Sequence, residues 1–344
     1  MLADNTVKYE AYCEPAKEAA KEAAKEALRK APGTRSPGSA AGPGRAPGGN
    51  RGKGGKRMDA VYLNPRYLEE VVACPVCGGA ENPVAYGVTG HVNVMRCGCG
   101  VFYCDKRLTG EGLAAYWKDY LDNEHNADDT ERALRRRMYL VDFDYIERFL
   151  PDKSRILDVG CADGLFLDLF AARGHVCGGV EFGRSAARAA ARKYPVWEGS
   201  FPELDIPPDH DLIIFRGVLQ YLQKPRLFFQ KAVSLLRRGG LIFITAQPNM
   251  DSYCHRLYQN KFRLRLTPCD CVGFSPKSLS GEFGLLKCRL VGEKFFYEET
   301  PYANPEKDIA AVCGALRRRG AGGAITEPSP PFWGNMMTLV FRKQ

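Results

Sequence analysis

The sequence predicts an α/β protein whose main domain is a largely parallel sheet with helices on both faces. From residue 155 onward, short apolar runs alternate with helix-compatible segments, which is the pattern of successive β-α-β units. The first run breaks into a turn of small residues, which suits a ligand lying against backbone N–H groups at a helix start. Five cysteines between Cys74 and Cys104 predict a small metal-binding domain ahead of the sheet.

The elements of the sheet domain follow in order. Parallel strands are expected at 155–159, 176–181, 195–197, 211–215 and 240–246, with helices at 164–173, 184–193 and 226–237. Helices are then expected at 252–259 and 276–284, and strands at 287–296 and 336–342 that close the sheet in antiparallel fashion. Residues 318–333, rich in Gly and Pro, predict a loop.

The part ahead of the sheet divides into three segments. Strands are expected at 92–95 and 101–103, and helices at 113–121 and 130–150. The predicted domains are a mostly disordered tail (1–57), a zinc ribbon (58–112), connecting helices (113–150) and the sheet domain (151–344).

The tail holds most of the chain's basic character. A K-E-A-A repeat at 15–31 favours a solvated helix, and the Gly, Pro, Arg and Ser of 32–57 cannot bury enough surface to fold. The tail contributes +6 of the net charge of +9. The folded part therefore gives little electrostatic case for a nucleic-acid partner. The tail itself is either a dispensable extension or an arm that contacts RNA or a membrane.

No membrane span is expected, because no apolar run approaches the roughly 20 residues that cross a bilayer. The first residues lack the apolar core of a signal peptide. A cytoplasmic location is the expectation.

The small-residue turn follows the apolar strand that carries Asp158. Gly179-Val180-Glu181 comes 23 residues after that acid, at the carboxyl end of the second strand, where Glu181 can accept hydrogen bonds from a ribose diol. The turn has the pattern D-x-G-x-A-x-G and not the G-x-G-x-x-G of dinucleotide-binding folds. An acid on the first strand suits an ammonium group better than a pyrophosphate. The site is therefore not that of a dehydrogenase.

The segments that follow resemble class I S-adenosylmethionine-dependent methyltransferases over about 155–250. The matching sequences are I-L-D-V-G-C-A-D-G (156–164), G-V-E (179–181), E-G-S-F (198–201), D-L-I-I-F-R-G-V-L-Q-Y-L (211–222) and L-L-R-R-G-G-L-I-F-I-T-A-Q-P-N (235–249). The resemblance implies a Rossmann-like, seven-stranded sheet with S-adenosylmethionine over the carboxyl ends of the first strands.

The resemblance also implies which residues hold this cofactor. Glu181 would hold the ribose hydroxyls, and Arg216 would border the space for methyl transfer. The methionine part would be lined by Asp158, Gly160, Cys161 and Gly164, and the adenine would be flanked by Ser200 and Phe201.

Two cysteine pairs predict a structural zinc site. Cys74-x2-Cys77 and Cys97-x-Cys99 are separated by nineteen residues and supply four thiolates, as tetrahedral zinc requires. The second pair is one residue closer than usual, so Cys104 is a possible substitute ligand. Zinc would join two knuckles that have little core of their own.

A zinc ribbon ahead of this fold resembles a bacterial family of sugar methyltransferases and their relatives, encoded with surface-polysaccharide and secondary-metabolite pathways. Further matches, extending the resemblance over about 70–295, are G-V-F-Y (100–103), Y-W-K-D-Y (116–120), P-N-M-D-S (248–252) and F-S-P-K-S-L (274–279). The resemblance implies a sugar or nucleotide-sugar acceptor.

The sequence departs from that family where a general base is expected. Leu219-Gln220-Tyr221 stands in place of L-E-H, and Pro268-Cys269-Asp270 in place of P-x-H, so both family histidines are absent. Methylation of a hydroxyl oxygen needs a base within hydrogen-bond reach. The substitutes in this chain are Tyr221, Asp270 and His255.

The sequence thus predicts a methyltransferase that acts on a small molecule. One alternative is a nucleic-acid or protein methyltransferase that grips its polymer with the ribbon and the basic tail. Another is a catalytically silent binding protein, which the missing histidines favour and the intact cofactor residues oppose.

Overall fold

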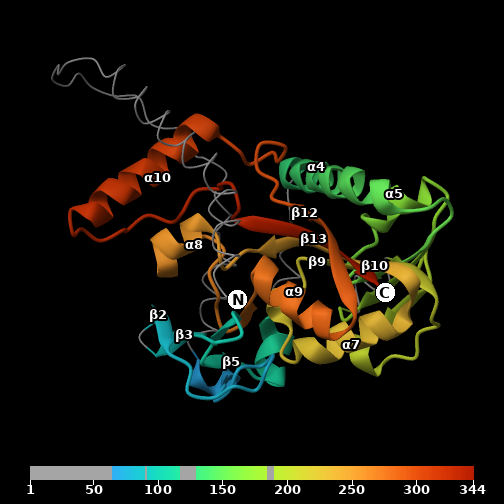
Figure 1. The fold of residues 1–344 in the computed structure, drawn as a ribbon, viewed down its shortest axis with the longest axis horizontal. Coiled ribbons are helices and arrows are strands. Elements are labelled where there is room, and N and C mark those ends of the chain that lie inside the picture. Colours follow the sequence, from blue (N-terminus) through green and yellow to red (C-terminus); the bar gives the residue numbers. More distant parts are fainter. Residues whose placement is uncertain (1–63, 90, 117–128, 184–189) are drawn as a thin grey trace, which may run out of the picture.

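The computed structural model describes residues 64–89, 91–116, 129–183 and 190–344. The predicted tail (1–57) lies outside these residues, as do most of the predicted helix 184–193 and the second half of the helix 113–121. Figure 1 shows a large central sheet with the ribbon strands to one side of it.

The central sheet has seven strands in the order β12-β13-β10-β9-β6-β7-β8. The strands are β6 (Arg155–Val159), β7 (Val176–Glu181), β8 (Val196–Glu198), β9 (His210–Arg216), β10 (Leu236–Pro248), β12 (Cys288–Lys294) and β13 (Met336–Lys343). Neighbours from β8 to β10 pair in parallel, whereas β13 pairs antiparallel with both β10 and β12. The predicted sheet and its antiparallel closure are confirmed.

Helices cover both faces of this sheet. They are α4 (Asp129–Ile146), α5 (Leu167–Ala171), α7 (Pro225–Leu235), α8 (Tyr253–Tyr258), α9 (Pro276–Leu285) and α10 (Pro305–Gly320), and residues 110–116 are also helical. In Figure 1, α4 and α5 lie on one side of the sheet and α7 and α9 on the other. Short 3-10 turns connect them: η1 (Pro65–Tyr67), η2 (Glu147–Phe149), η3 (Phe201–Glu203), η4 (Leu219–Tyr221) and η5 (Gln259–Lys261).

The hydrophobic core has a layer on each face of the sheet. Phe143 of α4 and Phe170 of α5 pack edge to face at 4.9 Å between ring centres. On the other face, Phe229 of α7 packs against Phe283 of α9, which stacks on Phe341 of β13. Aromatic pairs of this kind bury large areas in defined geometry, so they set how the helices lie on the sheet.

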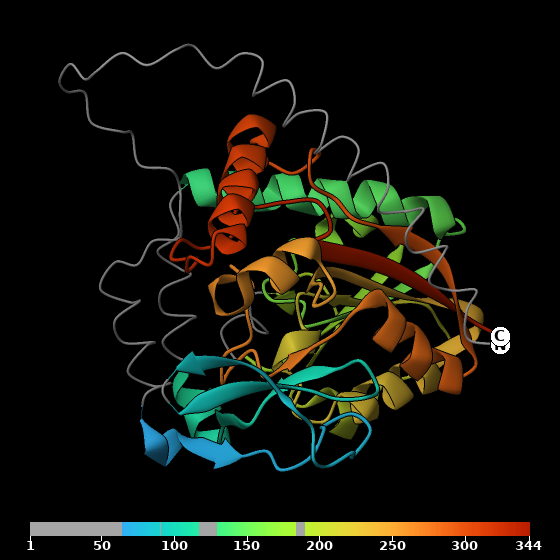
Figure 2. The same cartoon turned by 60° about the vertical axis from the view of Figure 1, so that its left-hand side comes forward.

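The ribbon forms two smaller sheets. One pairs β1 (Leu68–Glu70) with β5 (Lys106–Leu108), and the other has the order β11-β4-β3-β2. Its strands are β2 (Val84–Thr89), β3 (Val92–Arg96), β4 (Phe102–Cys104) and β11 (Val272–Gly273). β11 comes from the part of the chain that was assigned to the sheet domain (151–344), so the second sheet is completed by a strand from outside the predicted ribbon. Figure 2 shows these strands beneath the central sheet.

Several predicted boundaries differ from the structure. The helix expected from 164 begins as turns, and the regular helix starts at Leu167. α7 ends at Leu235 and β10 begins at once, with a register shift between Leu236 and Leu241 that accommodates the glycine pair 239–240. Helix α10 was not predicted; it covers the first residues of the predicted loop 318–333. In the described residues, no helix has the length and apolarity to cross a membrane.

Candidate active site

The turn after β6 is fastened to the neighbouring strand. The N–H groups of Gly160 and Cys161 both donate to the carbonyl oxygen of Val180, at 2.8 and 3.1 Å. Gly160 has φ +86°, and a Cβ there would lie 2.7 Å from Cγ2 of Val218. A residue without a side chain is therefore required, since both the backbone angle and the space exclude one. Gly164, with φ +81°, ends the turn against the ring of Tyr194.

Asp158 lies in the middle of the sheet with an unpaired polar atom. Its side chain on β6 is 2% exposed, and its Oδ1 has no hydrogen-bond partner among the described residues. Burial raises the pKa of this carboxyl to about 7, with the charge of Arg216 opposing the rise and that of Glu181 adding to it. An unpaired buried carboxyl is costly, and a cationic ligand such as an ammonium group would pair with it.

Glu181 closes the same turn from the end of β7. Its Oε2 accepts a hydrogen bond from the N–H of Ala162 at 2.9 Å, and its Oε1 accepts one from Gly183 at 2.7 Å. Ala162 has φ +48°, an unusual angle for a residue with a side chain. A carboxylate has further lone pairs beyond these two bonds, so it can still accept hydrogen bonds from a diol.

The other predicted cofactor residues differ in how they are placed. The Cys161 side chain is buried against β7, where a Cβ on Gly179 would lie 2.4 Å from its sulfur, so only its backbone borders the turn. Phe201 is 1% exposed and packs on Phe215 and Phe228. Ser200 precedes it at the start of η3 and is partly exposed.

Arg216 is held in place by helix α4. Its Nε donates to Oδ2 of Asp142 at 2.9 Å, and its guanidinium lies over the ring of Tyr139, 4.4 Å from the centre. Asp142 is 1% exposed and also accepts a 2.6 Å hydrogen bond from Thr245. Sequence reasoning missed Asp142 and Tyr139, because nothing in a charged helix 74 residues away marks them as partners of Arg216.

The structure brings two of the three predicted base residues together. Tyr221 in η4 forms a hydrogen bond with the carboxyl of Asp270. Thr267 donates a second one to Oδ2 of Asp270 at 2.9 Å. Burial raises the pKa of Asp270 to about 6, against the lowering effects of Thr267, Tyr221 and Arg265. The carboxyl is therefore ionised for the most part at neutral pH and able to accept a proton.

This pair lies at the edge of the sheet where the parallel strands end. Tyr221 follows the end of β9, and Gly217 donates to the carbonyl of Thr245 on β10 at 2.9 Å. The loop that carries Asp270 leads to Phe274, which bridges Asn249 just past β10. Asp158 and Glu181 stand at the same ends of β6 and β7. Donor and acceptor candidates thus share one edge, where open α/β sheets bind ligands.

His255, the third candidate, is engaged elsewhere. Its Nδ1–H donates to the carbonyl of Met250 at 2.5 Å, and its Nε2 accepts from the hydroxyl of Tyr86 at 2.8 Å. Its ring also contacts Phe102 of β4 and Phe262 edge to face. Burial lowers its pKa to about 4, so the ring is neutral. Both nitrogens are occupied, and we assign His255 to the packing of the ribbon against α8.

The four predicted zinc ligands form a cluster. The sulfur atoms of Cys74, Cys77, Cys97 and Cys99 all lie within 4.8 Å of one another. Cys77 and Cys97 are 3.3 Å apart, and Cys74 and Cys99 are 3.8 Å apart. Four sulfurs at such spacing fit a tetrahedral metal. Cys104 is outside the cluster; it is fully buried in β4, where its N–H bonds the carbonyl of Cys271.

The fold and the site define a class of domain. Residues 127–279 match a family model described as a methyltransferase domain. The matched residues include strands β6 to β10 of the central sheet, and the match agrees with the methyltransferase resemblance of the sequence.

Two named relatives are similar to part of the chain. Both are ubiquinone biosynthesis O-methyltransferases. The one from Aeromonas salmonicida is 23% identical over 137 residues, 35% of this chain and 57% of that protein. The one from Nitrosomonas europaea is 27% identical over 139 residues, 36% and 58% respectively. The chain therefore spans less than two thirds of the length of these curated relatives.

Solved structures show a looser similarity. A Thermotoga maritima SAM-dependent methyltransferase, described as a possible histamine N-methyltransferase, has a TM-score of 0.43 at 17% identity, covering 63% of this chain and 95% of that chain. The magnesium protoporphyrin IX methyltransferase of Synechocystis, with bound SAH, has a TM-score of 0.43 at 10% identity, covering 63% and 89%.

Proposed function

We propose that this protein transfers the methyl group of S-adenosylmethionine to a hydroxyl oxygen of a small molecule. The observation that carries the proposal is Asp158, a buried carboxyl with an unpaired oxygen beside a glycine turn. The ammonium group of the cofactor's methionine part would supply the missing partner. S-adenosylmethionine, when bound, supplies an electrophilic methyl group on a positively charged sulfur.

On the donor side, the chain binds and orients. Asp158 would hold the ammonium group, while the backbone of Gly160, Cys161 and Gly164 lets the ligand approach. Glu181 would accept hydrogen bonds from the two ribose hydroxyls. Ser200 and Phe201 would border the adenine, Phe201 from within the core. Arg216, fixed by Asp142, would border the space where the methyl group moves.

On the acceptor side, Asp270 and Tyr221 would take the proton. Transfer of the methyl group to a hydroxyl oxygen would release the hydroxyl proton, while the bound S-adenosylmethionine would supply the methyl group and a sulfur leaving group. The hydroxyl proton passes to the Asp270 carboxylate, which Tyr221 and Thr267 orient. A base with a pKa near the working pH suits this transfer. Holding the two reactants at attack distance supplies most of the acceleration.

The four-cysteine cluster would hold zinc as a structural ion. Four thiolates and no open position describe a closed site, which contributes folding energy and not reaction chemistry. Such a site would stabilise a ribbon with little core of its own.

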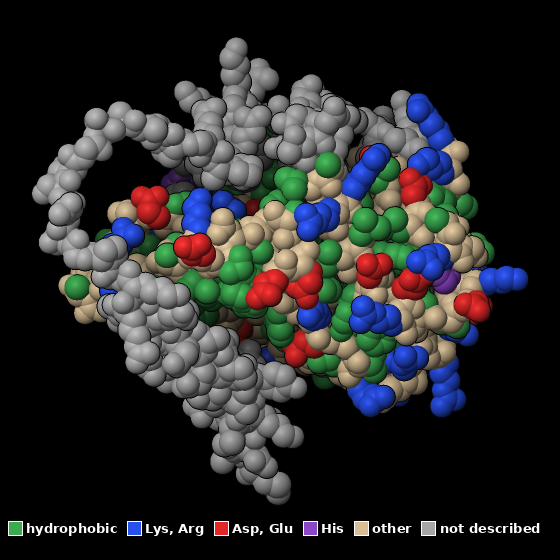
Figure 3. All heavy atoms as spheres, turned by 90° about the horizontal axis from the view of Figure 1, so that it is seen from above, with side chains coloured by type: hydrophobic (Ala, Val, Ile, Leu, Met, Phe, Trp, Pro, Cys, Tyr) green, Lys and Arg blue, Asp and Glu red, His purple; other side chains and the backbone are tan. Residues whose placement is uncertain are grey.

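For the acceptor we infer a sugar or a nucleotide sugar, from the resemblance of the ribbon and sheet to sugar methyltransferases. The curated relatives are named for O-methylation in ubiquinone biosynthesis, which agrees with an oxygen nucleophile but not with a sugar. A polymer acceptor has less support. On the face shown in Figure 3, Lys and Arg are interspersed with Asp and Glu and form no continuous basic area.

A methylation screen with labelled donor tests the proposal. Purified full-length protein is incubated with nucleotide sugars, free sugars, catechols and RNA, with Asp158→Asn as the inactive control. Label in a sugar supports the whole proposal. Label in a catechol alone supports transfer to a small-molecule oxygen but excludes a sugar as the acceptor. Label in RNA or in protein contradicts both the small-molecule acceptor and the sugar. Binding of the donor without any transfer would favour the catalytically silent alternative.

A further inference from the structure

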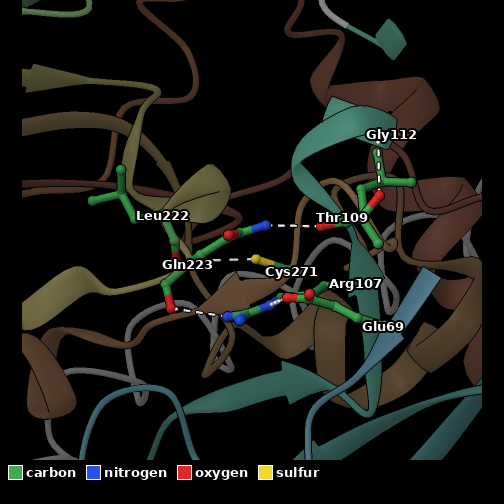
Figure 4. Close-up of polar contacts among 8 residues, drawn as sticks. Glu69, Arg107, Thr109, Gly112, Leu222, Gln223 and Cys271 are labelled. Atoms are coloured by element: carbon green, nitrogen blue, oxygen red, sulfur yellow. Dashed lines mark hydrogen bonds and ion pairs between the residues drawn. The ribbon is translucent and has the colours of Figure 1, made fainter. Parts of the chain in front are cut away.

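The segments that carry Tyr221 and Asp270 are both attached to one residue of the ribbon. The N–H of Leu108, the last residue of β5, donates to the carbonyl of Pro268 at 2.9 Å. The carbonyl of the same Leu108 accepts from Nε2 of Gln223 at 2.8 Å. Pro268 lies two residues before Asp270, and Gln223 two residues after Tyr221. Figure 4 shows the Gln223 side chain reaching toward β5.

A second contact holds Gln223 by its backbone. Nη1 of Arg107 donates to the carbonyl of Gln223 at 3.1 Å, and Nε of Arg107 pairs with Oε1 of Glu69 at 2.6 Å. Glu69 lies opposite Arg107 in the β1–β5 pair. Gln223 is therefore bound to β5 through both its side chain and its backbone, while the cation that binds it is fixed by the neighbouring strand (Figure 4).

The Asp270 loop is attached to the ribbon along its length. β11, directly after this loop, pairs antiparallel with β4, and the N–H of Cys104 donates to the carbonyl of Cys271 at 3.0 Å. The Cys271 thiol lies 4.0 Å from the carbonyl oxygen of Leu222, across from the Tyr221 segment. Leu108 and Cys269 are both buried in a small apolar cluster against which Tyr221 packs.

We propose that β5 of the ribbon is a positioning element for the acceptor site, and that Gln223 is a positioning residue that couples the Tyr221 segment to the Asp270 loop through the Leu108 peptide group. This inference rests on the proposed function, since it assigns a role to the pair that would take the proton. It gives the ribbon a part in the reaction beyond stability.

The physical reason is that the Tyr221–Asp270 bond joins two connecting segments. Such segments move more than the strands they connect unless other contacts hold them. The Leu108 peptide uses its donor on one segment and its acceptor on the other, so displacing either one disturbs both. The donor side differs, because the turn after β6 is bonded directly to Val180 and Glu181 of β7. The ribbon is thus expected to govern the acceptor half and leave cofactor binding unchanged.

Hydrogen exchange measured on full-length protein tests this without a known acceptor. Gln223→Met keeps the length of the side chain but removes the N–H donor, and Gln223→Lys restores a donor. Gln230→Met, at an exposed position of α7, is the matched control. Exchange is followed at the amides of 219–223 and 269–271, and S-adenosylmethionine affinity is measured by calorimetry.

We expect about fivefold faster exchange in both segments of Gln223→Met, because one hydrogen bond of about 1 kcal/mol is lost. Exchange in Gln223→Lys should return toward the wild-type rate, and Gln230→Met should match the wild type. Cofactor affinity should stay within about twofold in all three, since no donor-side bond is lost. Faster exchange at 219–223 alone would overturn the coupling, and an equal loss of cofactor affinity would show a general role in folding instead.

Once a methylated acceptor is known, Gln223→Met should lower kcat about tenfold while the KM of the acceptor changes little. Small displacements of a base reduce the rate of reaction more than they reduce binding. An unchanged kcat would overturn the positioning role. If no acceptor is methylated by the wild-type protein, the proposed function fails while the exchange result still decides the coupling.

Discussion

The proposed donor half and the proposed acceptor half of the site are built in different ways. The donor half uses one β-α-β unit, in which the Gly160 turn and Glu181 are bonded to each other and to β7 over a short stretch of sequence. The acceptor half collects Tyr221, Asp270 and the β5 strand from three distant parts of the chain. Local turn chemistry can specify the first arrangement, whereas only packing between domains can specify the second.

This difference suits a fold in which one reactant is constant and the other varies. The donor half depends on the backbone angles of the turn at Gly160 and on two acids, Asp158 and Glu181, which lie on strands of the sheet. The acceptor side depends on loops supported by an added ribbon. Connecting segments tolerate sequence change better than the strands they join. Tyr221 and Asp270, where the sequence departs from the sugar-methyltransferase pattern that it resembles, lie on such segments. The turn at Gly160 keeps the methyltransferase pattern.

The largest expected effect is loss of zinc from the ribbon without loss of cofactor binding. Cys97→Ser should lower bound zinc from about one ion per chain to about none, because three thiolates at this site hold zinc far less tightly than four. Cofactor affinity should change by less than about threefold, since the donor cradle lies on the central sheet. Elemental analysis and calorimetry measure the two quantities.

Cys104→Ala is the matched control for that experiment, because Cys104 is buried in strand β4 of the ribbon but lies outside the cluster. It should keep its zinc. Full metal content in Cys97→Ser, or its loss in Cys104→Ala, would contradict the ligand set.

The next effect concerns the donor half alone. Glu181→Ala should weaken S-adenosylmethionine binding by at least about 100-fold, because two hydrogen bonds to a charged group are lost, each worth about 1.5–3 kcal/mol. Glu203→Ala, at an exposed position in η3, should bind as the wild type does. Calorimetry at constant pH measures both, and equal affinities would refute the assignment of Glu181.

The pH dependence of cofactor binding tests Asp158. Because the pKa of the Asp158 carboxyl is raised to about 7, this carboxyl is largely protonated below pH 7 in the protein without cofactor. The carboxyl must lose its proton before it can pair with a cation. Affinity should therefore fall up to about tenfold for each pH unit below 7. Asp158→Asn should bind weakly without this slope, and a flat profile in the wild type would count against the pairing.

The same group makes the free protein less stable as pH rises. Its folded-state pKa is raised above the ordinary value of 3.8, so its contribution to stability is fully present below that value and is lost as pH rises through about 7. Asp158→Asn should flatten this part of the curve of unfolding free energy against pH. A steeper decline in the variant would show that another group carries the dependence.

The smallest effect concerns the backbone of the cradle. Gly160→Ala and Gly174→Ala both place a side chain at similar positive φ, but only at Gly160 would the new Cβ meet another atom, Cγ2 of Val218 at 2.7 Å. Gly160→Ala should therefore cost about 1–2 kcal/mol more unfolding free energy than Gly174→Ala. Adding Val218→Ala should recover part of that difference in denaturant titrations. Equal losses of unfolding free energy in the two variants would mean that the turn at Gly160 accommodates the added Cβ without strain.

Much of the fold was predictable because each strand of the main sheet is a separate apolar run. The strands from Arg155 to Arg216 and the antiparallel closure by Met336–Lys343 agree with the predictions within a few residues. Helix α10 was missed, and its last residues fall in the segment that was predicted as a loop. The two residues of β11 carry no pattern at all, since they become a strand only by pairing with β4.

The sequence by itself determined the class of the fold, the cysteine cluster and the position of Asp158 and Glu181 at the ends of adjacent strands, because alternation, spacing and turn chemistry are local properties. The tertiary structure decided the rest. It paired Tyr221 with Asp270, occupied both nitrogens of His255, and placed Asp142 against Arg216. Apart from the local bond between His255 and Met250, these contacts join residues 49 to 169 positions apart. No local preference encodes which of many polar side chains will meet once the core has packed.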